Sequence, residues 1–125
     1  MKKIIHTPNA PKAVGPYSQA VEANRMLFVS GQIPIDPAIG KVIEGGIREQ
    51  TLQVMKNIDA ILAEAGLEFK NVVKCTCLLS DMENFAAMNE VYGSFFQENP
   101  PARAAFGVVK LPLGALVEIE CIAAR

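Results

Sequence analysis

Tryptophan is absent from these 125 residues, histidine occurs once, and aromatic residues make up only 6% of the chain. A serine–histidine–acid hydrolase or a multi-histidine metal centre is therefore disfavoured, because the lone His6 has no evident relay partner. Twelve basic residues balance 13 acidic ones, for a net charge of −1, so the composition offers no general attraction for phosphate backbones or anionic lipid. No apolar run is long enough to span a bilayer.

Cysteine is also scarce, and its count of three is odd. A fully paired disulfide framework is thereby excluded, and reduced thiols in a cytoplasm are the simpler interpretation. Cys75-x-Cys77 with Cys121 is not one of the usual zinc patterns, so no metal is predicted and the thiols are expected to be buried and inert. No export signal is visible at the N-terminus, where the only apolar run is Ile4-Ile5.

The hydrophobic pattern predicts one α+β domain that spans residues 1–125, with the element order ββ(β)αβαββ and no linker or repeat. Three prolines between residues 8 and 16 exclude a helix or a central strand, so this segment is expected to be an extended loop. Asn24 suits a left-handed turn between two strands. Apolar residues recur every three or four positions from 46 to 65, which predicts an amphipathic helix that ends at Gly66.

The second half of the chain supplies another helix and three more strands. Residues 72–80 are rich in β-branched and small apolar side chains, and a helix is expected to start at Asp81 or Asn84. Strands are then predicted over 103–109 and 115–123, with a turn around Pro112. Both helices are long enough to cover a sheet, so we expect them on one face only.

The last two predicted strands carry the charged residues of greatest interest. Alternation puts Glu118 and Glu120 on the face of the final strand that points away from the core. A hairpin between the two strands would pair Arg103 near Glu120 and Ala105 near Glu118, on the face that the helices leave open. Spacing alone favours a solvated, ion-paired face, whereas the many small and apolar neighbours favour a subunit interface with a ligand site. The exposed apolar face predicts a homo-oligomer.

Several short motifs, spread from Asn9 to Ala124, together resemble the RidA (YjgF) family of reactive-intermediate deaminases. No one motif is decisive, but their order and spacing agree with the family along nearly the whole chain. The matching segments are Asn9-Ala10-Pro11, Gly15-Pro16-Tyr17-Ser18-Gln19-Ala20, Val29-Ser30-Gly31-Gln32-Ile33-Pro34, Gln50-Thr51, Asn57-Ile58, Asp81-Met82-Glu83-Asn84-Phe85, Met88-Asn89-Glu90-Val91-Tyr92, Pro101-Ala102-Arg103, Leu111-Pro112 and Val117-Glu118-Ile119-Glu120.

The resemblance implies a chorismate-mutase-like α+β fold, a mixed sheet with two helices on one face. It also implies a homotrimer around a central β-barrel, with one cleft for a small 2-imino or 2-keto acid at each subunit interface. The implied activity is hydrolysis of enamine and imine intermediates, such as 2-aminoacrylate or 2-aminocrotonate, to 2-keto acids and ammonia. The resemblance further implies an enzyme that needs no cofactor. The absence of a metal, the absence of a membrane partner and the cytoplasmic location are expected from the composition and the cysteine pattern instead.

Position by position, the resemblance implies that Arg103 binds the substrate carboxylate and that Glu118 orients or activates water. Many members of the family have a cysteine where this chain has Ala105, so no thiol at that position is essential here and the preferred substrate is left open. The residues implied to line the cleft are Tyr17, Ser30, Gly31, Asn89, Arg103 and Ala105.

Two other functions stay open. The resemblance also implies, as an alternative, an endoribonuclease or translation-inhibiting activity. The balanced charge disfavours this as the primary role, because contacts between cations and phosphates dominate the affinity for nucleic acids. The Arg103 cleft could instead bind a keto acid or an amino acid as a sensor, without turnover. Release of ammonia from a freshly generated 2-imino acid separates an enzyme from a sensor.

Overall fold

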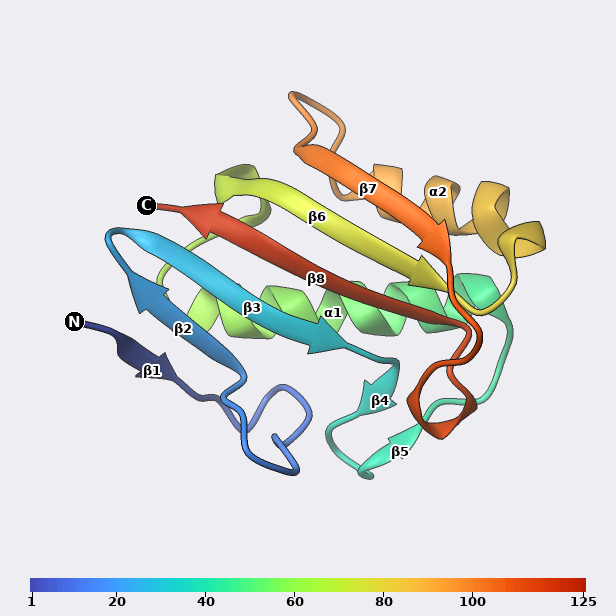
Figure 1. The fold of residues 1–125 in the computed structure, drawn as a ribbon, viewed down its shortest axis with the longest axis horizontal. Helices are drawn as coiled ribbons and strands as arrows, with labels where there is room; N and C mark the ends of the chain where they lie inside the picture. The colour runs from blue at the N-terminus through green and yellow to red at the C-terminus, as the bar shows by residue number, and fades with distance from the viewer.

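A mixed β-sheet and two α-helices make up the structure, a computed structural model that describes residues 1–125 (Figure 1). Three single-turn 3-10 helices, Phe69–Asn71, Met82–Asn84 and Pro112–Gly114, lie in the connections. No helix is both long enough and apolar enough to cross a membrane. The strands and helices are β1 (Lys3–Ile5), β2 (Ala20–Ala23), β3 (Met26–Gln32), β4 (Ile35–Asp36), β5 (Lys41–Val42), α1 (Ile47–Glu64), β6 (Val72–Leu79), α2 (Phe85–Ser94), β7 (Ala102–Gly107) and β8 (Val117–Ala124).

The larger sheet has the strand order β1-β2-β3-β8-β6-β7, and the smaller sheet pairs β4 with β5. Neighbouring strands of the larger sheet are antiparallel except for β6 and β7, which are parallel. Parallel neighbours need a crossover connection, and α2 with its flanking turns supplies it. Figure 1 shows both helices behind the sheet, so the face toward the viewer is uncovered. The predicted α+β class and one-sided helices are confirmed; we call the uncovered side the open face.

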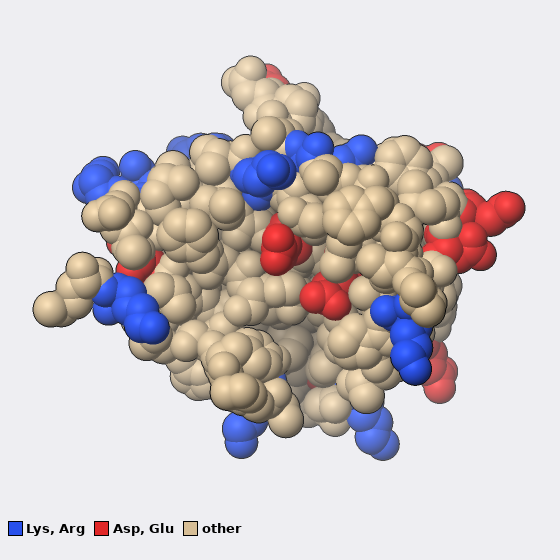
Figure 2. All heavy atoms as spheres, viewed as in Figure 1, with Lys and Arg blue, Asp and Glu red and all other residues tan.

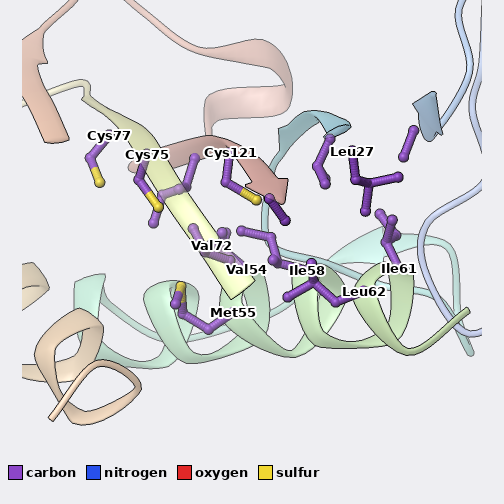
Figure 3. Packing of buried hydrophobic residues seen from close by; sticks show 14 of the residues in the cluster. Leu27, Val54, Met55, Ile58, Ile61, Leu62, Val72, Cys75, Cys77 and Cys121 are labelled. Atoms are coloured by element: carbon purple, nitrogen blue, oxygen red, sulfur yellow. The ribbon is translucent and has the colours of Figure 1, made fainter. Parts of the chain in front are cut away.

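The core lies between α1 and the helix-facing side of the sheet (Figure 3). Val54, Met55 and Ile58 on α1 are each at most 1% exposed and belong to a cluster of 23 buried hydrophobic residues. Each such side chain stabilises the fold by about 1.5–3 kcal/mol relative to leaving it in water. The helix ends as predicted: Gly66 has φ +74°, and the Leu67 amide donates back to the carbonyl of Leu62 at 2.8 Å.

The predicted turn at Asn24 is confirmed, and two residues form it. Asn24 and Arg25 have φ of 51° and 63° between the paired residues Ala23 and Met26. Two successive left-handed residues match the right-handed twist of a hairpin, and asparagine adopts this conformation at low cost.

The predicted hairpin between the last two strands is wrong. β6 lies between β7 and β8, with Arg103 paired to Cys75, which in turn pairs with Cys121. Paired residues point to the same face, so Arg103 lies on the helix side of the sheet while Glu118 and Glu120 lie on the open face. The physical reason is α2, which returns the chain parallel to β6 and beside it. The chain then crosses the end of β6, and β8 fills the space between β3 and β6.

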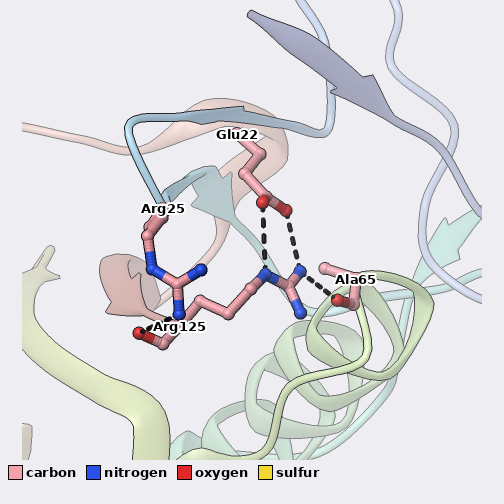
Figure 4. Close-up of polar contacts among 4 residues, drawn as sticks. All are labelled: Glu22, Arg25, Ala65 and Arg125. Carbon is pink, nitrogen blue, oxygen red and sulfur yellow. Dashed lines mark hydrogen bonds and ion pairs between the residues drawn. The ribbon is translucent and has the colours of Figure 1, made fainter.

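Arg125 joins three distant parts of the chain at the far end of the sheet (Figure 4). Its Nε and Nη2 donate to the two carboxylate oxygens of Glu22 on β2, at 3.2 and 2.9 Å. Nη2 also donates to the carbonyl of Ala65, at the C-terminal end of α1. A cation at these last carbonyls complements the helix dipole, so this arginine stabilises both the helix end and the strand pairing.

Candidate functional site

Arg103 is held against α2 by three side chains. Its Nη1 donates to Oδ1 of Asn89 at 2.6 Å, and its Cζ lies 5.0 Å from the ring centre of Tyr92 and 5.5 Å from that of Phe85. No carboxylate of the chain forms an ion pair with Arg103. A guanidinium has five N–H donors, and Asn89 uses one of them. We call these four residues, Phe85, Asn89, Tyr92 and Arg103, the arginine cluster. It presents an oriented cation whose remaining N–H donors can bind an external anion.

Ala105 follows Arg103 on the same side of β7 and packs partly buried against the core. Its partner across the strands is Cys77, which is fully buried. Burial raises the pKa of the Cys77 thiol to about 12, and the neighbouring Cys75 adds to this rise although Arg103 opposes it. The Cys77 thiol is therefore neutral at physiological pH and adds no negative charge beneath the arginine cluster. The prediction of three free, buried cysteines is confirmed.

Glu118 lies in a depression on the open face, with a volume of about 540 Å³. A Cβ atom added to Gly31 would lie 2.0 Å from Glu118 Oε2, so the carboxylate rests directly against the bare backbone of β3. Only glycine leaves room for the carboxylate in this position. The depression, which we call the glutamate depression, is lined by Val14, Tyr17, Ser30, Gly31, Ile33, Pro112, Glu118 and Glu120.

Partial burial in the glutamate depression, together with the charge of Glu120, raises the pKa of Glu118 above its ordinary value. Neither carboxylate has an ion-pair partner within the chain. A carboxyl group with a raised pKa accepts a proton more readily than an ordinary exposed glutamate does. Glu118 is thus suited to acid–base chemistry.

The proline-rich loop that carries Tyr17 is fixed by one buried side chain, Gln19. Its Oε1 accepts from the Thr7 amide at 2.7 Å, and its Nε2 donates to the carbonyls of Thr7 and Pro11 at 3.0 and 2.9 Å. The Ser30 hydroxyl donates to the carbonyl of Ser18 at 2.6 Å. These bonds on both sides of Tyr17 hold the loop against β3, at the edge of the glutamate depression.

Sequence reasoning did not identify Gln19, Gln50 and Asn57 as supports of this region. The amide of Asn57 donates to the carbonyls of Ile33 and Ile35 at 3.2 and 2.9 Å, and Oε1 of Gln50 accepts from the Leu116 amide at 2.8 Å. All three supports are buried. Two features of the sequence could have indicated these residues. Gln50 and Asn57 fall on the apolar face of α1, and Gln19 follows a proline-rich segment whose carbonyls have few backbone donors nearby.

The predicted site residues form two groups on opposite faces of the sheet. The predicted contact between Arg103 and the glutamates within one chain is wrong, because the β-sheet separates them. One group can orient a small anion, and the other can exchange a proton. Tyr17, Ser30, Gly31 and Glu118 lie together in the glutamate depression, and Asn89, Arg103 and Ala105 lie together beside α2.

The chain matches known proteins over nearly its whole length, including every residue of the two groups. Residues 7–125 match the family described as Endoribonuclease L-PSP. The chain is 49% identical over 125 residues to the 2-iminobutanoate/2-iminopropanoate deaminase of Mus musculus, covering 100% of this chain and 93% of the mouse protein. It resembles the structure of YyfA from Yersinia pestis, described as a protein of unknown function of the conserved Rid family, with TM-score 0.98, 47% identity and 100% of both chains covered. E. coli TdcF, solved with bound serine, gives TM-score 0.94 and 41% identity, over 98% of each chain.

Proposed function

Because this chain belongs to the RidA (YjgF) family, we propose that it hydrolyses small 2-imino and 2-enamino acids to 2-keto acids and ammonia. Substrates of the 2-aminoacrylate or 2-aminocrotonate type fit this proposal. The deaminase name of the mouse relative supports the reaction, and the serine bound to the E. coli relative supports a ligand of amino-acid size. The family description as an endoribonuclease names the rival activity, which the net charge of −1 disfavours.

The observation that carries the proposal is Arg103, which Asn89 orients and no carboxylate of the chain neutralises, so it can bind the carboxylate of a small acid. The sheet separates the arginine cluster from the glutamate depression, so the two groups do not meet within one copy of the chain. A complete site then takes its anion-binding group from one copy of the chain and its proton-exchanging group from another. We propose a homotrimer in which the open faces form a central β-barrel and each interface contains one cleft. The exposed aromatic side chains Phe28 and Phe106, 45% and 48% exposed, support burial of the open face by other copies.

In the proposed reaction, Arg103 binds the substrate carboxylate through two parallel N–H donors. Each charge-assisted hydrogen bond is worth about 1.5–3 kcal/mol, and together the two bonds fix the position of C2. Glu118 of the neighbouring copy orients the water that attacks C2. A protonated imine is already a strong electrophile, so positioning and proton transfer are sufficient to account for the reaction.

We also propose a reducing compartment, the cytoplasm. Cys75 and Cys121 are direct partners across β6 and β8, and both are free thiols. Cross-strand partners lie about 4.5–5.5 Å apart at Cα, a separation that disulfides commonly bridge. The odd count of three cysteines excludes a fully paired disulfide framework, which supports a compartment that keeps cysteines reduced.

Complementation between two inactive variants tests this proposal. Arg103→Ala lacks the anion site and Glu118→Gln lacks the proton-exchanging group, so each variant alone should release no ammonia from a freshly generated 2-imino acid. Co-expressed in equal amounts, the two chains should assemble at random and recover about a quarter of the wild-type activity, since each site draws its two groups from different copies.

Arg103→Lys serves as a second variant, since lysine keeps the charge but not the paired donors. We expect it to be inactive in an intact oligomer. Wild-type activity in Arg103→Lys contradicts the bidentate carboxylate site, and no recovery in the mixed oligomers contradicts the shared cleft. Absence of ammonia release by the wild-type chain contradicts the proposed function itself.

A further inference from the structure

The three side chains that contact Arg103 come from one stripe of α2. Phe85, Asn89 and Tyr92 are spaced by four and three residues, which puts them on the same face of the helix. The Cζ atom of Arg103 lies 5.5 Å from the ring centre of Phe85 and 5.0 Å from that of Tyr92, and Nη1 donates to Asn89 at 2.6 Å. The guanidinium therefore meets two aromatic rings about two helical turns apart, with its hydrogen-bond acceptor on the turn between them.

The way in which Arg103 is held differs from that of two other arginines in the chain. Arg48 and Arg125 each bind a carboxylate, that of Glu90 and that of Glu22, at 2.6 and 2.9 Å. The only cation–ring contacts in the chain are those of Arg103. An aromatic ring attracts a cation through the electron density of its face, so it uses no N–H donor and brings no negative charge. Rings can therefore hold the guanidinium and leave it able to bind an anion.

Both rings are fixed by packing. Tyr92 is 6% exposed, and its ring centre lies 4.9 Å from that of Phe96. Phe85 is partly buried and packs against the hydrophobic core. The Tyr92 hydroxyl makes no hydrogen bond to Arg103, so the ring itself provides the contact. Arg103 is exposed, and without these contacts its long side chain would have many conformations.

The restraint matters in the proposed cleft because a carboxylate lies across from Arg103. Figure 2 shows acidic side chains near the middle of the open face and most basic side chains around its margin. The acidic residues of the glutamate depression are Glu118 and Glu120. In the proposed cleft Arg103 faces Glu118 of the neighbouring copy, and a mobile guanidinium would pair with that carboxylate. A guanidinium held by α2 stays on its own side of the cleft and leaves room for the substrate.

We propose that Phe85 and Tyr92 are positioning residues for Arg103: their rings orient the guanidinium in advance and keep its charge available for the carboxylate of the substrate. This inference rests on the proposed deaminase function. A site that is already ordered loses less entropy when its ligand binds. At an exposed site, one cation–ring contact is worth a factor of about two to five in an equilibrium constant, and the contact strengthens when a neighbouring copy excludes water.

Fluorinated phenylalanines at position 85 test the electron density of the ring separately from its shape. One, two or three fluorine atoms change the size of the ring little but progressively weaken the attraction of its face for a cation. In the assembled full-length protein, we expect the affinity for 2-oxobutanoate, a 2-keto acid of the proposed product class, to fall stepwise, by about two- to fivefold in total. The same series at Phe69, whose ring packs against Phe95 and Phe96 and does not contact Arg103, should leave the affinity unchanged.

Two variants test the second ring. Tyr92→Phe keeps the ring and removes only a hydroxyl that Arg103 does not use, so the affinity for 2-oxobutanoate should stay near that of the wild type. Tyr92→Leu removes the ring and should lower the affinity. The motion of Arg103 gives a further readout without ligand or turnover. NMR relaxation of its Nε–H group, identified by the loss of the signal in Arg103→Lys, should show increasing motion along the fluorine series at position 85.

Equal affinity along the fluorine series overturns the inference, as does unchanged Nε–H motion, because the rings would then only pack against the side-chain stem of Arg103. The motion is measured without substrate, so its outcome is separate from that of the ammonia assay. Motion and affinity that change along the series in a protein that releases no ammonia support the role of the rings and contradict the proposed function. Ammonia release with both values unchanged has the opposite meaning.

Discussion

Gly31→Ala should reduce turnover strongly without unfolding the protein. The added Cβ would lie 2.0 Å from Glu118 Oε2, whereas ordinary van der Waals contact begins at about 3.4 Å, so the carboxylate must retreat by about 1.4 Å. The clash falls on the flexible end of a side chain, so the strand itself can stay in place. A misplacement of about 1 Å at a reacting group costs on the order of 100-fold in rate, and we expect kcat for ammonia release to fall by about that factor.

A matched glycine in the same chain provides the control. Gly93 in α2 has no atom within 4 Å of an added Cβ and does not have a positive φ. Gly93→Ala should keep wild-type kcat and raise the melting temperature slightly, because alanine is favoured over glycine in a helix by about 0.5–1 kcal/mol. Thermal unfolding and kcat are measured on both variants. Wild-type kcat in a folded Gly31→Ala protein refutes the role given to the Glu118 carboxylate.

Two further changes test the arginine cluster and the Arg125 contact. Asn89→Asp puts a carboxylate at the 2.6 Å contact with Arg103 Nη1, so it competes with the substrate and should raise KM by at least about tenfold; an unchanged KM contradicts this. The hydrogen bond from Arg125 holds the pKa of Glu22 below its ordinary 4.5, so the pair adds stability at neutral pH that is lost as the pH falls through the lowered value. Glu22→Gln should therefore melt at a lower temperature than wild type at pH 7 and lose less stability on acidification; parallel melting curves from pH 7 to 3 would show the reasoning to be wrong.

Local features of the fold could be predicted from the sequence because neighbouring residues determine them. The period of α1, the left-handed turn at Asn24 and the helix end at Gly66 depend on a few adjacent positions. The face on which Arg103 lies depends instead on which strand is paired with β7, and the alternation of side chains along β7 does not reveal that pairing. A usable signal was present: a helix between two strands makes them parallel and places them close together in one sheet.

The candidate residues were grouped wrongly for the same reason. Glu118, Ser30 and Gly31 come together because β3 and β8 are neighbours, although nearly 90 residues separate them in the chain. Asn89 meets Arg103 because α2 packs beside the strand that follows it. Motif resemblance indicated which residues matter, but the strand order determines which of them can meet within one copy.

Helix α2 does two jobs at once, because it sets the direction of β7 and also carries Asn89 to Arg103. One residue inserted before Asn89 within the helix would rotate its side chain by about 100°. The spacing from Phe85 to Tyr92 is consequently under tight length constraint, whereas the exposed turn at 38–41 should absorb insertions. Among members of this family, insertions and deletions should therefore occur in the β4–β5 hairpin and not in α2.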